Sequence, residues 1–132
     1  MTEIELNAKE KKEHDDVIES VRAKLIADGN EVEVNKFKSK SSPVTYTKGD
    51  GTKGQYYPDV YTHKDSIVTK MFEVETLSSV NDDQAENQWK LYSKGKAKFY
   101  LVVPESKLEE AKNLAKKYKV EVEDYWFYEA EK

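Results

Sequence analysis

The sequence contains no cysteine among its 132 residues, which excludes disulfide bonds, zinc–thiolate sites and catalysis by a thiol. It also lacks any apolar run approaching the roughly 20 residues that a membrane-spanning helix needs. The N-terminus has no signal-peptide core, so we expect a cytoplasmic protein without a membrane partner. Overall positive charge is missing too, because the formal net charge is −4. Any surface that binds nucleic-acid phosphates must therefore be local.

What the chain has in abundance is charge of both signs. Charged residues make up 36% of the sequence and hydrophobic residues 37%, so we expect a modest core inside a highly charged surface. The length fits one domain over residues 1–132, with a flexible N-terminus at about residues 1–7. Lysines gather in two stretches, between residues 36 and 53 and between residues 90 and 98. These lysines could be merely solvated, or they could form a local surface for phosphates.

Hydrophobic periodicity predicts three helices and five long strands. An apolar residue at every fourth position predicts a helix over residues 7–28, with His14 flanking the apolar stripe. Alternation, apolar runs and turn residues predict strands over residues 31–38, 56–63, 67–76, 97–103 and 120–128. The two later helices should span residues 78–94 and 106–119. Their expected caps are Ser78 or Ser79 for the former and a Ser106–Glu109 capping box for the latter.

The order of these elements, α-β-β-β-α-β-α-β, predicts an α/β fold with a mixed sheet. The last two strands follow helical crossovers, which favour parallel addition to the sheet. Residues 39–55 form a loop that is long for a compact domain, and such loops are often functional. This loop could contain a short hairpin that turns at residues 49–51, because residues 44–47 are β-prone.

Three acidic side chains on two neighbouring strands are the most informative feature. Glu73 and Glu75 are two positions apart on one strand and therefore point to the same face. A hairpin centred on Ser66 would place Asp59 directly opposite Glu73, with Cβ atoms about 5 Å apart. A two-residue slip would keep the face but move Asp59 toward Met71 or Glu75. Converging carboxylates repel one another unless a cation, a proton or water relieves them, so this is a candidate metal site.

The motifs around these acids resemble those of the PD-(D/E)XK nuclease superfamily, which has the restriction-endonuclease-like fold. That family carries Pro-Asp on its second core strand, Asp/Glu-x-Lys on its third and often Gln-x-x-x-Tyr on the next helix. The matching segments are Pro58-Asp59, Glu73-Val74-Glu75 and residues 88–92, which run from Gln88 to Tyr92. The departure is Glu75, which stands where the family has lysine. The resemblance spans most of the chain and implies a central mixed sheet flanked by helices.

The resemblance also implies a metal-dependent chemistry. A Mg²⁺ or Mn²⁺ ion would be held by Asp59, Glu73 and the backbone carbonyl of Val74. Glu75 would act as a general base or as a second-metal ligand. Gln88 belongs to the same catalytic group and would contact substrate or water, as would Gln84. The expected acid from the first helix is Glu19, with Glu10 and Glu13 as alternatives. The remaining substrate-binding candidates are Tyr57, Lys38, Lys40, Lys48 and Lys53.

Two functions follow from this resemblance. The first is a nuclease that hydrolyses DNA, and the intact carboxylate trio favours it. The second is a catalytically inactive module that binds nucleic acid or a protein partner, which the absent lysine and the acidic net charge favour. A homodimer is compatible with either. An unrelated α/β domain would be indicated if the three carboxylates lay on different faces or were merely solvated.

The histidines and aromatic residues favour structural roles. His14 and His63 are interpreted as core-edge or surface residues rather than metal ligands, because the sequence offers no metal-ligand spacing for them. Most tyrosines and both tryptophans are interpreted as core residues. Tyr56 and Tyr57 are the exceptions, because they lie beside the predicted carboxylate cluster and could stack on bases.

Overall fold

The computed structural model describes residues 8–37 and 40–130, and its main sheet has five strands in the order β1-β4-β5-β6-β7. These strands are β1 (Glu31–Val34), β4 (Val60–Lys64), β5 (Ile67–Val74), β6 (Lys98–Pro104) and β7 (Asp124–Tyr128). The β1–β4 and β4–β5 pairs are antiparallel, whereas β6 and β7 add in parallel. The α/β class, the mixed sheet and the parallel additions after the helical crossovers are therefore confirmed.

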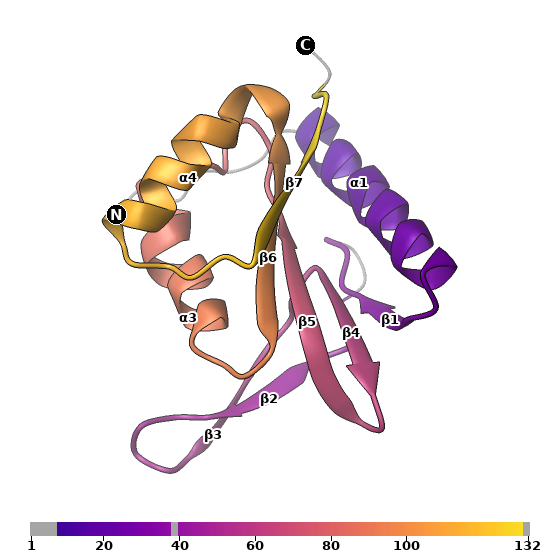
Figure 1. Ribbon diagram of the computed structural model, residues 1–132, viewed down its shortest axis with the longest axis vertical. Helices are drawn as coiled ribbons and strands as arrows, with labels where there is room; N and C mark the ends of the chain where they lie inside the picture. Colours follow the sequence, from indigo (N-terminus) through magenta and orange to yellow (C-terminus); the bar gives the residue numbers. More distant parts are fainter. Residues whose placement is uncertain (1–7, 38–39, 131–132) are drawn as a thin grey trace.

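Helices cover both faces of this sheet (Figure 1). Helix α1 (Ala8–Ala27) packs on one face, where Ile18, Val21 and Leu25 join Phe72 and Val74 in a buried cluster. The other face carries α4 (Leu108–Lys117) and a helical segment of three parts, together with a larger cluster centred on a fully buried tryptophan. The three parts are α2 (Asp82–Gln84), the π-helical η1 (Ala85–Trp89) and α3 (Lys90–Ser93).

The predicted loop over residues 39–55 contains a separate two-stranded sheet, which bears out the hairpin considered for it. Strands β2 (Val44–Thr47) and β3 (Lys53–Tyr56) pair with each other and project below the main sheet in Figure 1. The expected strand over residues 56–63 is thereby divided. Tyr56 ends β3 and Val60 begins β4. Pro58 lies between them and has no N–H group with which to continue a strand ladder.

The register of the β4–β5 hairpin places Asp59 opposite Glu73. The turn residues Asp65 and Ser66 both have positive φ, and Lys64 pairs with Ile67. This two-residue turn alone would align Asp59 with Phe72. A one-residue shift between Thr62 and His63 corrects the alignment, because Val60 then pairs with Phe72. The same bulge places Val68 and Phe72 on opposite faces of the sheet, since Val68 packs in the Trp89 cluster and Phe72 in the α1 cluster.

Several predicted element ends need correction. Asn81, and not Ser78 or Ser79, caps the segment after β5, because the Ser79 hydroxyl accepts a hydrogen bond from Thr76 N instead. The Ser106–Glu109 capping box does not form: residues 105–107 make the 3₁₀ turn η2 (Glu105–Lys107), and α4 has no side-chain cap. The strands predicted over residues 31–38 and 120–128 are shorter, as β1 and β7. The predicted flexible segment, residues 1–7, lies outside the described residues, as does Lys38.

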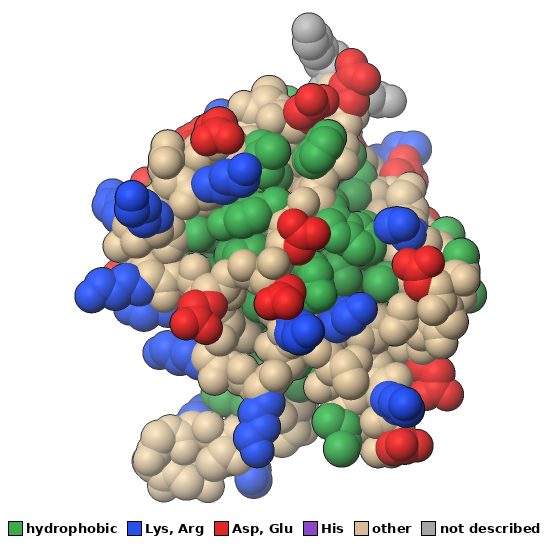
Figure 2. All heavy atoms as spheres, viewed as in Figure 1, with side chains coloured by type: hydrophobic (Ala, Val, Ile, Leu, Met, Phe, Trp, Pro, Cys, Tyr) green, Lys and Arg blue, Asp and Glu red, His purple; other side chains and the backbone are tan. Residues whose placement is uncertain are grey.

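The surface of the described chain is mixed in character. Figure 2 shows hydrophobic side chains gathered on the face where β7 forms an edge of the sheet, and Phe127 is 57% exposed there. Lysine and acidic side chains surround that patch. None of the helices within residues 8–37 and 40–130 is long and apolar enough to cross a membrane.

Helices α1 and α4 end in the same backbone geometry, which generates a stability prediction. Gly29 (φ 90°) follows α1 and Lys119 (φ 56°) follows α4. The left-handed conformation costs a residue other than glycine roughly 1–2 kcal/mol. Replacing that residue by glycine removes this cost, but part of the gain is lost because glycine loses more chain entropy on folding. Lys119→Gly should therefore raise the free energy of unfolding by about 0.5–1 kcal/mol. Gly29→Ala should lower it by about 1 kcal/mol. Urea unfolding measures both, and a destabilised Lys119→Gly would contradict the expectation.

Candidate functional site

The three predicted carboxylates meet in one small pocket of about 120 Å³. Asp59 lies immediately before β4, while Glu73, Val74 and Glu75 lie at the end of β5. The helical segment that follows borders the same pocket. Of the residues predicted for the site, those that line the pocket are Lys40, Tyr57, Asp59, Glu73, Val74, Glu75, Gln84 and Gln88.

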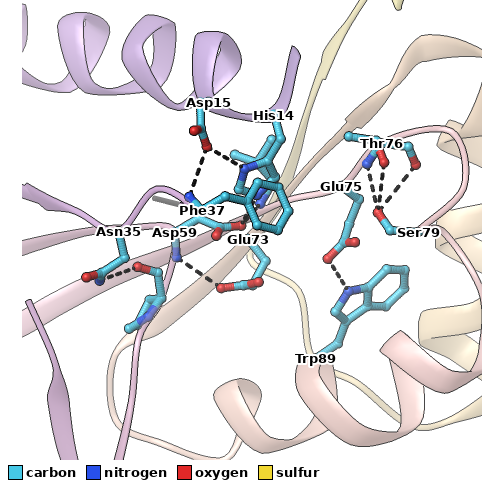
Figure 3. A network of polar contacts seen from close by, with 12 residues as sticks. His14, Asp15, Asn35, Phe37, Asp59, Glu73, Glu75, Thr76, Ser79 and Trp89 are labelled. Carbon is cyan, nitrogen blue, oxygen red and sulfur yellow. Dashed lines mark hydrogen bonds and ion pairs between the residues drawn. The ribbon is translucent and has the colours of Figure 1, made fainter. Parts of the chain in front are cut away.

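Asp59 is fixed by backbone contacts on both sides. Asn35 is fully buried, donates its side-chain amide to Pro58 O (2.8 Å) and donates its backbone N–H to Asp59 O (2.9 Å). The Asp59 carboxylate accepts a hydrogen bond from Val74 N (2.8 Å), and Asp59 N donates to Glu73 Oε1 (3.1 Å). The two acidic residues thus hold each other in place across the hairpin (Figure 3). Asn35 was not predicted, and its role depends on a long-range contact that the sequence pattern does not signal.

Glu75 is held by contacts from strands β6 and β7 and from the helical segment that follows β5. Its backbone N–H donates to Val102 O (2.8 Å), and its backbone carbonyl accepts from the Tyr128 hydroxyl (2.7 Å). Its side chain accepts a hydrogen bond from Trp89 Nε1 (3.1 Å). Trp89 is fully buried and belongs to the π-helical η1. Such π-helical turns occur frequently at functional sites. Glu75 is therefore a buried member of the pocket and not a solvated strand residue.

His14 is a second site residue that sequence reasoning missed. It is 6% exposed, and its Nε2 lies 3.1 Å from Asp59 Oδ2. Its Nδ1 lies 3.1 Å from Asp15 Oδ1, which also accepts a hydrogen bond from Phe37 N. Figure 3 shows the imidazole between the two aspartates. The one available signal was its position four residues before Ile18, on the face of α1 that packs against the sheet.

The charges in the pocket shift the protonation of their neighbours. Burial raises the pKa of Glu73 well above its usual range, and the negative charges of Asp59 and Glu75 raise it further. Burial likewise raises the pKa of Glu75 to about 7, although hydrogen bonds from Ser79 and Trp89 oppose the shift. Burial on its own would lower the pKa of His14, but the adjacent Asp59 and Asp15 outweigh it and raise that pKa to about 9. At neutral pH, His14 is a cation within an acidic pocket.

Other predicted site residues lie elsewhere. Glu19, the expected acid from the first helix, does not line the pocket but pairs with Lys36 (2.7 Å) and Arg22 (3.4 Å), which corrects that prediction. His14 takes the pocket-facing position on α1 instead. Glu10, an alternative in the prediction, accepts a hydrogen bond from Ser78 N (3.0 Å) in the loop after β5. Lys48 and Lys53 belong to the β2–β3 hairpin and do not line the pocket, and Lys38 lies outside the described residues.

The donor atoms suit a hard cation that keeps part of its water shell. No group of three or more His, Asp or Glu side chains in the described part of the chain is arranged to hold a metal ion by itself. Mg²⁺ is, however, commonly held by one or two carboxylates together with waters and substrate phosphates. Asp59 and Glu73 provide two such carboxylates. Gln84 Oε1 is buried at the pocket and accepts no hydrogen bond from the described residues, so it can accept one from a metal-bound water or a substrate.

No protein-family model, curated protein or solved structure matched the chain. What the pocket can bind or catalyse therefore follows from its own residues. Three carboxylates, an imidazole and two side-chain amides surround it. Such a set can bind a hard cation through oxygen, and it can take up or release protons close to neutral pH.

The protonation of these groups predicts how stability depends on pH. Without divalent cations, the free energy of unfolding should fall as the pH rises from about 5 to about 9. The pKa of Glu75 rises from 4.5 to about 7 on folding, so its contribution is complete below 4.5 and is lost by about pH 7. The contribution of His14 is lost between pH 6.5 and about 9, where its folded-state pKa lies. Urea unfolding in a chelator at several pH values measures the trend.

A matched pair of variants assigns the lower part of this trend. Glu75→Gln cannot ionise, so it should remove a decline of about 3 kcal/mol between about pH 4.5 and 7. Glu86 is exposed on the same helical segment, and Glu86→Gln should keep the wild-type profile. A wild-type stability that increases through this pH range would show that the buried carboxyl groups do not hold protons.

Proposed function

We propose that the protein is a metal-dependent nuclease that hydrolyses DNA phosphodiester bonds and belongs to the PD-(D/E)XK superfamily. The observation that carries the proposal is the convergence of Asp59, Glu73 and Glu75 in one pocket at the ends of adjacent strands. Gln84 and Gln88 from the following helical segment line that pocket as well. Apart from the β2–β3 hairpin, the elements follow the order α-β-β-β-α-β-α-β that the sequence predicted, which supports the proposal.

Asp59 and Glu73 are the proposed ligands of a Mg²⁺ or Mn²⁺ ion, with the backbone carbonyl of Val74 as a third donor. When bound, such an ion neutralises charge on the phosphate and lowers the pKa of a coordinated water. Burial raises the pKa of Glu73, and a bound cation would favour its ionised form. Asp59 is already oriented by Val74 N and by His14, so its carboxylate needs no rearrangement.

Glu75 is the proposed general base. Its pKa of about 7 suits proton transfer near neutral pH, and Trp89 Nε1 fixes the direction of its carboxylate. Gln84 and Gln88 would orient the substrate or the attacking water. Lys40 and Tyr57 line the pocket and would contact a phosphate, while Lys48 and Lys53 would contact the nucleic acid from the hairpin.

The alternative is a nuclease-fold module that binds nucleic acid or a protein partner without cleaving it. One observation favours this alternative: the position of the family's lysine holds Glu75, which is buried and hydrogen bonded to Trp89. Lys40 is the one lysine among the described residues that line the pocket, and it lies at an exposed position. Without the family's lysine, cleavage would therefore require Glu75 to act as the general base.

Metal titration combined with a cleavage assay separates the two functions. Adding Mg²⁺ or Mn²⁺ should cause saturable shifts of the backbone amide signals of Asp59 and Glu73. Asp59→Ala should abolish these shifts and reduce DNA cleavage by more than about 100-fold. Glu86→Ala changes an exposed acid and should alter neither property. Saturable shifts without cleavage would support the non-catalytic module, and the absence of any shift would refute the metal site.

The pH profile of cleavage tests the role of Glu75. A general base acts in its deprotonated form, so the rate should rise with pH and level off at or below the pKa of about 7 that Glu75 has without a cation. Glu75→Gln should reduce the rate by about 100-fold to 10,000-fold and remove this limb of the profile. If Glu75→Gln kept both the rate and the profile, Glu75 would have no part in proton transfer.

A further inference from the structure

A second and larger cavity, of about 730 Å³, opens beside the acidic pocket. Its walls come from the β2–β3 hairpin, the β4–β5 hairpin, Glu33 of β1 and residues 95–97, which connect α3 to β6. We call this cavity the tyrosine groove, because Tyr46, Tyr56 and Tyr61 all line it. None of the roles proposed above for the acidic pocket uses these three side chains.

The tyrosine groove leads toward the acidic pocket through a row of aromatic rings. The rings of Tyr46 and Tyr56 have their centroids 5.0 Å apart, and those of Tyr56 and Tyr92 are 4.6 Å apart. Tyr92 lines the acidic pocket, whereas Tyr46 and Tyr56 line the groove. A chain-like ligand could thus contact the groove and the carboxylates at the same time.

The outermost ring of this row is held rigidly. Tyr46 packs against Gly54 of the paired strand, and a Cβ atom at Gly54 would come within 2.8 Å of the tyrosine ring. Tyr46 is nevertheless only half-buried, so part of its ring is accessible. A rigid and accessible aromatic face in a concave site loses little conformational entropy when a flat group stacks on it.

The charges around the groove suit a polyanion. Lys96 lines it, Lys94 is close in sequence, and Lys48 and Lys53 lie on the hairpin that forms the opposite wall. Figure 2 shows lysine side chains on and around this hairpin. None of these four lysines forms an ion pair within residues 8–37 and 40–130. The acidic lining residue, Glu33, has its Oε1 atom 3.5 Å from His63 Nε2.

We infer that the tyrosine groove binds unpaired nucleotides of a single-stranded segment beside the phosphate that is cleaved. The inference rests on the proposed function and specifies its substrate as a nucleic acid with an unpaired stretch. Bases stack on tyrosine faces only when they are free of their own duplex stack, while lysines hold the backbone. A cavity of this volume is within the range of about 300–1,000 Å³ that holds small ligands, and a DNA duplex is too wide to enter it.

Fluorescence anisotropy with the full chain in a chelator tests the inference, because no cleavage can then occur. The probes are a short labelled oligothymidylate, an oligouridylate of equal length and the corresponding DNA duplex. The single strand should bind at least about tenfold more tightly than the duplex, and Tyr46→Leu should weaken single-strand binding by about tenfold. Tyr46→Phe keeps the stacking ring and should bind like the wild type. Whichever single strand binds more tightly identifies DNA or RNA as the substrate.

Two further variants serve as controls for this test. Phe127→Leu changes an exposed ring outside the groove and should leave binding unchanged. Lys96→Gln alters the other wall and should weaken binding and its salt dependence, even if Tyr46→Leu fails to fold. The inference is overturned if the duplex binds as tightly as the single strand, or if no probe binds. It is also overturned if neither Lys96→Gln nor a folded Tyr46→Leu changes single-strand affinity.

The cleavage assay distinguishes failure of this inference from failure of the proposed function. Tight single-strand binding that depends on Tyr46, without cleavage in the presence of any divalent metal, would support nucleotide binding in the groove and refute the proposed nuclease activity. Asp59-dependent cleavage of fully paired DNA that is insensitive to Tyr46→Leu would uphold the nuclease and refute the groove.

Discussion

The burial of three carboxyl groups in one pocket is the constraint on which the site depends. Asp59, Glu73 and Glu75 are each less than 10% exposed, and like charges so confined repel one another strongly. The chain relieves this repulsion with three devices: the His14 imidazole, the Trp89 indole and hydrogen bonds from the backbone of the β4–β5 hairpin. Protons on Glu73 and Glu75 relieve the rest. A cation would replace those protons, and this exchange links the stability of the pocket to its proposed chemistry.

The fold supplies these devices from elements far apart in the chain. Helix α1 brings His14 from one side of the sheet, and the segment α2–η1–α3 brings Trp89 and Gln84 from the other. The β2–β3 hairpin contributes Tyr46 and Tyr56 to the tyrosine groove, which reaches toward the turn of the β4–β5 hairpin. The acidic pocket therefore lies where elements from both helical layers meet the start of β4 and the end of β5. Hydrolysis and phosphate contact are proposed for the acidic pocket, and base stacking for the neighbouring groove.

Local patterns were sufficient for the main elements. Period-2 alternation and a hairpin centred on Ser66 predicted that Asp59 faces Glu73, and the structure has this alignment through a two-residue turn combined with a bulge. The bulge between Thr62 and His63 was not predictable, because no residue in that stretch demands it. His14 and Asn35 were missed for a different reason. A histidine on an apolar helix stripe and an asparagine after a strand are ordinary residues, and only the packing of α1 and β1 against β4 reveals their partners.

The error on Glu19 has the same origin. A helix of known position can still rotate, and the rotation of α1 is set by the burial of Ile18, Val21 and Leu25. That rotation turns His14 toward the pocket and leaves Glu19 beside Lys36. A family motif that specifies only the helix of a residue therefore predicts that residue poorly. A motif that fixes the exact position on one face predicts it better.

The exchange of protons for a cation is measured most directly by calorimetry of Mg²⁺ binding in buffers of different ionisation enthalpy. Near pH 6, which is below its pKa of about 7, Glu75 holds a proton in the absence of a cation, and burial raises the pKa of Glu73 as well. Binding of one Mg²⁺ ion should therefore release about one proton or more, and fewer should be released as the pH rises. Binding without proton release would contradict it, because the buried carboxyl groups would then be ionised without the ion. No detectable binding in wild type would contradict it equally.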